Sequence, residues 1–166
     1  MFHRYAQAAA EQPERVERSQ LATLLEGALQ AEGLQGEILA VASQRLLRAV
    51  NTLLDSERGH WILAKHQAAA CEVELGSMID GVAAQRIVDR SFIDEQGRRW
   101  IIDYKTGDTD GDVAAFVDAQ QAQYREQLDG YAHIYAQLEA RPIRCGLYFP
   151  MLDAWREWAP EPLAPG

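Results

Sequence analysis

The segment that most constrains the fold is the run Arg86–Gly107, RIVDRSFIDEQGRRWIIDYKTG. Its β-branched and aromatic residues flank Glu95–Gly97, a composition typical of a turn between two strands. Side chains along a strand alternate between the faces of the sheet, so Asp103 and Lys105 share one face and Tyr104 occupies the other. We therefore predict a β-hairpin with an acidic and a basic side chain together near the end of its second strand.

A third polar residue, Asp89, interrupts the apolar first strand of this hairpin. A turn at Glu95–Gly97 brings Asp89 next to the second strand, a few pairs from the turn, where Asp103 also lies. Two carboxylates beside a lysine are costly to gather unless a cation holds them, and oxygen ligands suit a hard ion such as Mg²⁺. A lysine beside such an ion can steady a hydroxide nucleophile or the charge that develops on phosphate, so the pattern indicates a nuclease.

The alternative is a purely structural role for Asp103 and Lys105. A same-face Asp/Lys pair on a strand is usually a solvated ion pair that contributes well under ~1 kcal/mol. Spacing alone does not separate the two interpretations. Asp89 shifts the balance toward the functional one, because it adds a second carboxylate on the neighbouring strand.

Beyond these residues, the chain resembles a known family. The runs Ile87–Arg90, IVDR, and Ile101–Gly107, IIDYKTG, look like the RecB-like nuclease domain of the PD-(D/E)XK superfamily. The similarity is strongest to the version at the C-terminal end of UvrD/Rep-type helicases, as in the AddA and RecB helicase–nuclease subunits. Tyr124–Tyr131 matches the family pattern Tyr-x-x-Gln-Leu-x-x-Tyr, and His3 matches a histidine on an early helix. The resemblance thus covers nearly the whole chain.

Two other positions bear on this resemblance. Glu72 falls where the family carries a glutamate on the first strand, and Glu74 competes with it two residues later. Arg86 stands three residues before Asp89, where the family usually has glycine, and a long cation there would crowd the strand or contact DNA.

The resemblance implies a set of site residues. It predicts Mg²⁺, for which Mn²⁺ can substitute, held by carboxylates, a backbone carbonyl and an imidazole from Asp89, Asp103, Tyr104, His3 and the weaker candidate Glu72. It predicts that Lys105 activates or positions the attacking water. Gln127 and Tyr131, which share a helix face at i and i+4, would contact substrate phosphate or orient that water.

The function so implied is that of a metal-dependent DNA nuclease, a phosphodiester hydrolase acting on single-stranded DNA. It would be the module of an ATP-dependent exonuclease in double-strand-break repair and recombination. Its partners would be an ATP-binding helicase motor in the same parent chain and a second helicase–nuclease subunit. Two alternatives remain open: a catalytically silent strand-binding module of a helicase, and a standalone restriction-type endonuclease. Exonuclease or endonuclease action, and its polarity, are not predicted.

Length and composition fit one cytoplasmic domain over residues 1–166 with a flexible Pro-rich tail at 159–166. The resemblance implies that it is a nuclease domain excised from a larger helicase. No apolar run reaches transmembrane length. Cys71 and Cys145 are too far apart in sequence for a C-x-x-C zinc site. The 16 basic and 25 acidic residues give a net charge of −9, which argues against strong autonomous binding to DNA.

The order of elements predicts an α+β (mixed α/β) domain, a restriction-endonuclease-like three-layer core with a small central mixed sheet flanked by helices. The expected helices are His3–Ala10, Ser19–Ala31, Gln35–Leu54 and Val117–Ala140, with a turn or short helix at Ser56–Leu63. The expected strands are Cys71–Met78 and Val82–Phe92 joined by Asp80-Gly81, then Ile101–Lys105, Ile143–Phe149 and Ala154–Trp158. The acidic loop Asp108–Asp112 is no EF-hand, because Ala119 replaces the closing glutamate.

Overall fold

The structure is a computed structural model that describes residues 1–12, 17–79 and 82–161, with side chains left undescribed over 77–86. It divides into two compact units. The helical unit comprises Met1–Ala64 with the short segments Thr106–Asp108 and Pro150–Asp153. The sheet unit comprises Lys65–Lys105, Thr109–Phe149 and the segment from Ala154 onward.

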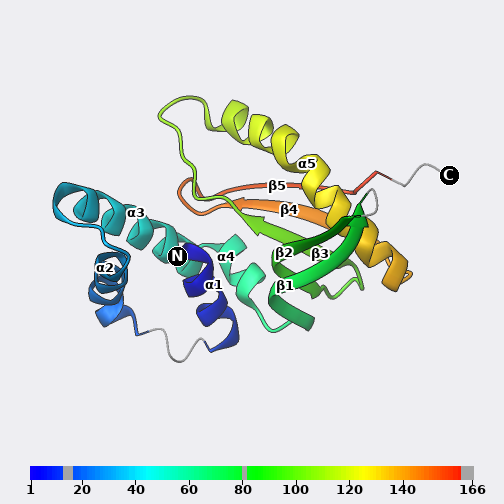
Figure 1. Ribbon diagram of the computed structural model, residues 1–166, viewed down its shortest axis with the longest axis horizontal. Coiled ribbons are helices and arrows are strands. Elements are labelled where there is room, and N and C mark those ends of the chain that lie inside the picture. Colours follow the sequence, from blue (N-terminus) through cyan, green and yellow to red (C-terminus); the bar gives the residue numbers. More distant parts are fainter. Residues whose placement is uncertain (13–16, 80–81, 162–166) are drawn as a thin grey trace. The chain divides into compact units, whose positions relative to one another are not determined.

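The helical unit is built from amphipathic helices with bounds α1 Phe2–Glu11, η2 Arg18–Gln20, α2 Leu21–Ala31, α3 Gly36–Asp55 and α4 Glu57–Leu63 (Figure 1). In α2 the buried residues recur every fourth position, at Leu21, Leu25 and Leu29, which gives this helix one apolar stripe. Ser56 starts α4, because its side chain accepts a hydrogen bond from the N–H of Gly59 at 3.0 Å. The predicted helices of this region are confirmed.

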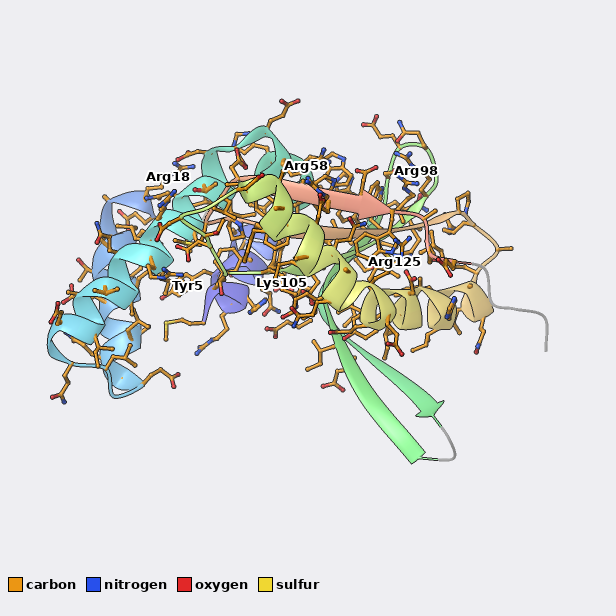
Figure 2. The ribbon with its side chains drawn as sticks, turned by 90° about the horizontal axis from the view of Figure 1, so that it is seen from above. Tyr5, Arg18, Arg58, Arg98, Lys105 and Arg125 are labelled. Atoms are coloured by element: carbon orange, nitrogen blue, oxygen red, sulfur yellow. The ribbon has the colours of Figure 1, made fainter. Side chains whose placement is uncertain are left out.

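The sheet unit contains five strands in the order β1-β2-β3-β4-β5, with bounds β1 Gln67–Ile79, β2 Val82–Ile93, β3 Arg99–Tyr104, β4 Ile143–Phe149 and β5 Ala154–Trp158. Among the strands that the structure describes, only β3 and β4 pair in parallel, and α5 (Val113–Leu138) connects them in sequence. β3 pairs with β2 over Ile93–Arg90, so the outer parts of β1 and β2 extend beyond the rest of the sheet (Figure 2). The sheet is mixed, and the predicted α+β class is confirmed.

Helix α5 runs along one face of this sheet (Figure 1). The thiol of Cys145 on β4 lies 3.6 Å from the carbonyl oxygen of Leu128, and the indole N–H of Trp158 on β5 donates to Asp129 at 2.7 Å. All six residues of β3 are buried. A central strand with neighbours on both edges therefore carries the polar residues of interest to one end of the core.

The boundaries of three predicted elements were wrong. The strand predicted at Cys71–Met78 begins four residues earlier, at Gln67. α5 begins at Val113 and not at Val117, because the carboxylate of Asp112 accepts hydrogen bonds from the N–H groups of Ala114 and Ala115 at 2.8 and 3.3 Å. The third strand begins and ends earlier than predicted, and Lys105 lies just past its last residue.

One predicted turn and one predicted side-chain effect concern residues or side chains outside the described ones. The Asp80-Gly81 turn lies outside the described residues, although β1 and β2 on either side of it pair antiparallel, with Met78 opposite Ala83. The side chain of Arg86 also lies outside the described ones. Among the helices that the structure describes, none has both the length and the apolar character needed to cross a membrane.

Candidate active site

The β2–β3 hairpin is pinned at its turn by Asp94. The carboxylate of this residue accepts hydrogen bonds from the backbone N–H groups of Gln96 and Arg98, at 3.0 and 2.9 Å, and from the Arg98 guanidinium at 2.7 Å. The Trp100 indole N–H donates to it at 2.7 Å. Gly97 takes φ +75, which a residue with a Cβ rarely adopts. These contacts hold the register that the rest of the site depends on.

The hydrogen bonds also change the acidity of Asp94. Burial alone would raise the pKa of this carboxyl, but the bonds from Trp100 and Arg98 outweigh burial and lower it below 3.8. The carboxylate is therefore charged near neutral pH. Sequence inspection identified the turn at Glu95–Gly97 but missed this aspartate, whose position one residue before the turn was the available signal.

The register of the hairpin brings Asp89 and Asp103 together. The pairing of β2 with β3 runs as far as Arg90 opposite Ile102, and the same register extended by one residue puts Asp89 opposite Asp103. Directly opposite residues of an antiparallel pair share a face of the sheet. The carboxylate of Asp89 also reaches β3, where it accepts a hydrogen bond from the N–H of Tyr104 at 2.8 Å. The predicted neighbourhood of the two carboxylates is thus present in the structure.

Lys105 completes this group. Its Nζ lies 2.6 Å from Oδ2 of Asp103, and the two side chains are only 18% and 10% exposed. Its own backbone N–H donates to the carbonyl oxygen of Tyr148 on β4 at 2.9 Å. The pair is therefore partly buried and anchored to the sheet, unlike the solvated ion pair of the structural alternative.

Tyr104 points to the opposite face, as the strand period predicts. Its side chain is buried and packs edge-on against Tyr148, with ring centroids 6.5 Å apart. Burial raises the pKa of the Tyr104 phenol far above its ordinary value of 10.0. The phenol therefore stays protonated and does not act as an acid or base near neutral pH. The contribution that remains for this residue is its backbone.

The sequence interpretation missed one contact of the lysine, the ring of Tyr124. Nζ of Lys105 lies 3.6 Å from the centroid of this ring, which belongs to α5. Figure 2 shows Lys105 beside this helix. Tyr124, Gln127 and Tyr131 follow one another at i, i+3 and i+7, so they form one stripe of the helix. That spacing was the signal from which the first tyrosine could have been included.

Gln127 and Tyr131 contact each other within this stripe. The amide nitrogen of Gln127 donates to the Tyr131 hydroxyl at 2.6 Å, and the tyrosine is buried. Their shared helix face is as predicted. Whether they contact phosphate or water during a reaction stays a prediction.

Glu72 occupies a notable position on β1. The pairs Cys71 with Arg90 and Val73 with Val88 place Glu72 opposite Asp89, whereas Glu74 lies opposite Ile87. Its backbone has φ +47, a strained value for a residue with a side chain. Its side chain is exposed. Register thus brings Glu72, and not Glu74, into one row with the two aspartates of the neighbouring strands.

The four histidines have contacts outside the group formed by Asp89, Asp103 and Lys105. His3 lies on α1 in the helical unit, where its ring meets the ring of Phe2 edge-on at 6.0 Å between centroids. Its role as a metal ligand stays a prediction. The other three have contacts of their own: His66 stacks on Phe92 at 3.9 Å, and ring nitrogens of His60 and His133 lie 2.7 and 2.9 Å from backbone carbonyl oxygens.

The acidic loop after Lys105 serves the fold. Asp108 forms a two-point ion pair with Arg45 within the helical unit, at 2.9 and 3.0 Å, while Asp112 caps α5. Each of these two carboxylates thus has a structural partner within its own unit.

The carboxylates at the end of β3 are of the kind that binds a hard divalent cation. Asp103 presents a largely buried carboxylate whose charge the Lys105 ammonium balances, and the Asp89 carboxylate binds the N–H of the next residue, Tyr104. Across the described residues no three His, Cys, Asp or Glu side chains gather at one point. A Mg²⁺ ion at this place would therefore complete its shell with backbone oxygen, water and substrate, as this ion commonly does.

Comparison with known proteins identifies a family for this chain. No curated protein matches the chain. The family model described as the PD-(D/E)XK nuclease superfamily matches residues 1–160, which is nearly the full length. The Asp–Asp-x-Lys pattern, its place on two paired strands and this match lead to one conclusion: the chain belongs to the PD-(D/E)XK nuclease superfamily.

Proposed function

We propose that this protein hydrolyses phosphodiester bonds of DNA with the help of a divalent metal ion. Membership of the nuclease superfamily supports hydrolysis in general. The observation that carries the proposal is the group formed by Asp89, Asp103 and Lys105, in which two facing strands present two carboxylates and a partly buried lysine.

In this proposal Asp89 and Asp103 hold Mg²⁺, and the backbone carbonyl of Tyr104 is a further ligand. The ion, when bound, withdraws charge from the scissile phosphate and lowers the pKa of a coordinated water. Lys105 positions the attacking water or stabilises charge that develops on the phosphate. The hydrogen bond from the Tyr104 N–H orients the Asp89 carboxylate toward the end of β3.

Four further residues have supporting roles in the proposal. Glu72 is an additional ligand or an outer-shell acid, which its register position opposite Asp89 supports. His3 supplies an imidazole nitrogen to the same ion. Gln127 and Tyr131, whose hydrogen bond links their side chains, contact the substrate phosphate or orient the water.

The substrate is proposed to be single-stranded DNA delivered by a helicase. Residues 1–166 would act as one nuclease module of a larger UvrD/Rep-type helicase engaged in double-strand-break repair and recombination, alongside a second subunit. The net charge of −9 supports delivery by a motor, because an acidic module repels the phosphate backbone and gains little from counterion release.

The test compares the wild-type chain with Asp103→Ala on labelled single-stranded DNA, at low salt with Mn²⁺ or Mg²⁺. Low salt strengthens the local contacts in which basic side chains release counterions from the phosphate backbone. Wild-type protein should cut slowly and the variant should not cut, which also excludes a contaminating nuclease. Asp110→Ala is the matched control, because Asp110 is exposed in the acidic loop. This variant should cut DNA at the wild-type rate.

Fusing the chain to a helicase motor should raise the wild-type rate and leave Asp103→Ala inactive. If wild type and Asp103→Ala degrade DNA equally poorly in both settings while both still bind the strand, the catalytic proposal is wrong. A strand-binding module without catalysis would then take its place.

A further inference from the structure

The ammonium of Lys105 has two partners of different kinds. Nζ lies 2.6 Å from the carboxylate of Asp103 and 3.6 Å from the centroid of the Tyr124 ring. The carboxylate comes from β3 and the ring from α5, and all three residues belong to the sheet unit. The lysine head is therefore held between the sheet and the helix that covers it.

The ring contact is close and partly shielded from water. A cation within about 6 Å of an aromatic centroid is attracted by the negative face of the ring, and the attraction grows as water is removed. The Lys105 side chain is 18% exposed, so few water molecules compete for its ammonium. Its main chain is fixed as well, through the hydrogen bond from Lys105 N–H to Tyr148 at 2.9 Å. Both ends of a flexible side chain are thus restrained.

The two partners of Lys105 differ in their other contacts in the proposed function. In the proposed function Asp103 also binds the metal ion, so its carboxylate is shared. The face of the Tyr124 ring offers no oxygen ligand and is available to the ammonium alone. The ring is therefore the partner that can keep Lys105 in place while the carboxylate serves the ion.

We infer that Tyr124 is a positioning residue for Lys105, acting through the face of its ring and not through its hydroxyl group. This inference rests on the proposed function and extends it, because it names what holds the lysine for its part in hydrolysis. It sets Tyr124 apart from Gln127 and Tyr131, which bond to each other further along the helix.

The first test is spectroscopic and needs no catalysis. A ring face near Nζ shifts the neighbouring ε-CH₂ protons upfield, which two-dimensional NMR of protein labelled with ¹³C-lysine detects at Lys105. The upfield shift should persist in Tyr124→Phe and disappear in Tyr124→Leu. Tyr135→Leu is the matched control on the same helix, because the Tyr135 ring instead meets Arg99, at 4.9 Å from its centroid. An unshifted Lys105 signal in wild type would overturn the inference.

The second test is kinetic. In single-turnover cleavage of single-stranded DNA, Tyr124→Leu should lower the rate at saturation about tenfold, equivalent to ~1.4 kcal/mol. The DNA concentration that gives half the maximal rate should change less than about twofold, because the ring positions the lysine and does not bind substrate. Tyr124→Phe should behave like wild type, and so should Tyr135→Leu once both are checked for folding.

The outcomes separate this inference from the proposed function. If Tyr124→Phe loses as much rate as Tyr124→Leu, the hydroxyl is the active part and the inference is wrong. If Tyr124→Leu abolishes the NMR shift yet cuts at the wild-type rate, the ring contact does not position the lysine for hydrolysis. If Lys105→Ala cuts normally, the proposed function of the lysine fails, whatever the NMR signal shows.

Discussion

Each end of the β2–β3 hairpin has a buried aspartate, and the two carboxylates have partners of different kinds. At the turn, Asp94 accepts four hydrogen bonds from groups of its own hairpin, two from backbone N–H groups and one each from Arg98 and Trp100 side chains. At the other end, Asp103 is paired with Lys105, a long side chain whose charge sits at the tip. Both carboxylates are poorly exposed, at 6% and 7% by residue.

The difference shows how one sheet builds both a fixed and an exchangeable acid. Donors from the backbone and an indole are set by the fold, so the Asp94 carboxylate can only be satisfied where it is. The partner of Asp103 is instead a side-chain ammonium that the Tyr124 ring also holds, so in the proposed function the carboxylate can bind a metal ion as well. Asp94 thus serves register, and Asp103 is the acid whose partners the proposed function allows to change.

The largest expected effect concerns the exchangeable end. Lys105→Ala should lower the rate of DNA cleavage by at least ~100-fold, the scale on which one charge partner of the transition state acts. Metal binding should persist, because both proposed carboxylate ligands remain. Cleavage kinetics together with metal titration measure the two effects. Lys65→Ala is the control, since Lys65 is exposed and its loss removes the same charge. Unchanged cleavage by Lys105→Ala would remove the lysine from the mechanism.

The next effect concerns the fixed end. Asp94→Ala should lower the free energy of unfolding by about 3 kcal/mol, because it leaves the buried Trp100 indole N–H and the turn N–H groups without their acceptor. Urea unfolding followed by tryptophan fluorescence measures this loss. Glu95→Ala, at an exposed position of the same turn, should stay within about 0.5 kcal/mol of wild type. Equal stability of the two variants would contradict the structural role assigned to Asp94.

A smaller effect concerns the stability of the protein at acidic pH. Bonds from Arg99 lower the pKa of Glu139 below 4.5, and the pKa of Asp94 also lies below its ordinary 3.8. A lowered pKa in the folded state means that stability is fully present above the unfolded value and is lost as pH falls through the folded one. The free energy of unfolding should therefore decline as the pH drops below about 4.5.

Denaturant unfolding between pH 3 and pH 6 measures this slope. Glu139→Gln should be less stable than wild type at pH 6, and the gap should narrow toward pH 3 as the wild-type carboxyl is protonated. A gap that stays constant across this range would contradict the assignment.

The smallest expected signal is the response to the metal itself. Mg²⁺ should shift backbone resonances of Asp89, Asp103 and Tyr104 with weak affinity, because much of the ion's shell would be water. The Tyr104 amide is the sharpest reporter, since it donates directly to the Asp89 carboxylate. The shifts should vanish in Asp103→Ala. Shifts confined to Asp108–Asp112 would assign the ion to the acidic loop instead.

Several elements could be predicted from local pattern, and their misplaced ends have local causes. Apolar stripes predicted the helices, and alternation around Glu95–Gly97 predicted the hairpin, because both depend on neighbours in sequence. The start of α5 was misplaced because Asp112 was interpreted only as part of an acidic loop. Its carboxylate in fact caps the helix.

The candidate site divides in the same way. Sequence alone determined that Asp103 and Lys105 share a face, because strand geometry requires it, and the acidic interruption of an apolar strand pointed to Asp89. Only the tertiary structure decided that Glu72, and not Glu74, falls opposite Asp89, since register depends on pairing between strands. It alone brought the ring of Tyr124 to Lys105. A helix stripe shows which residues lie together, but the packing of α5 on the sheet decides which of them contacts the lysine.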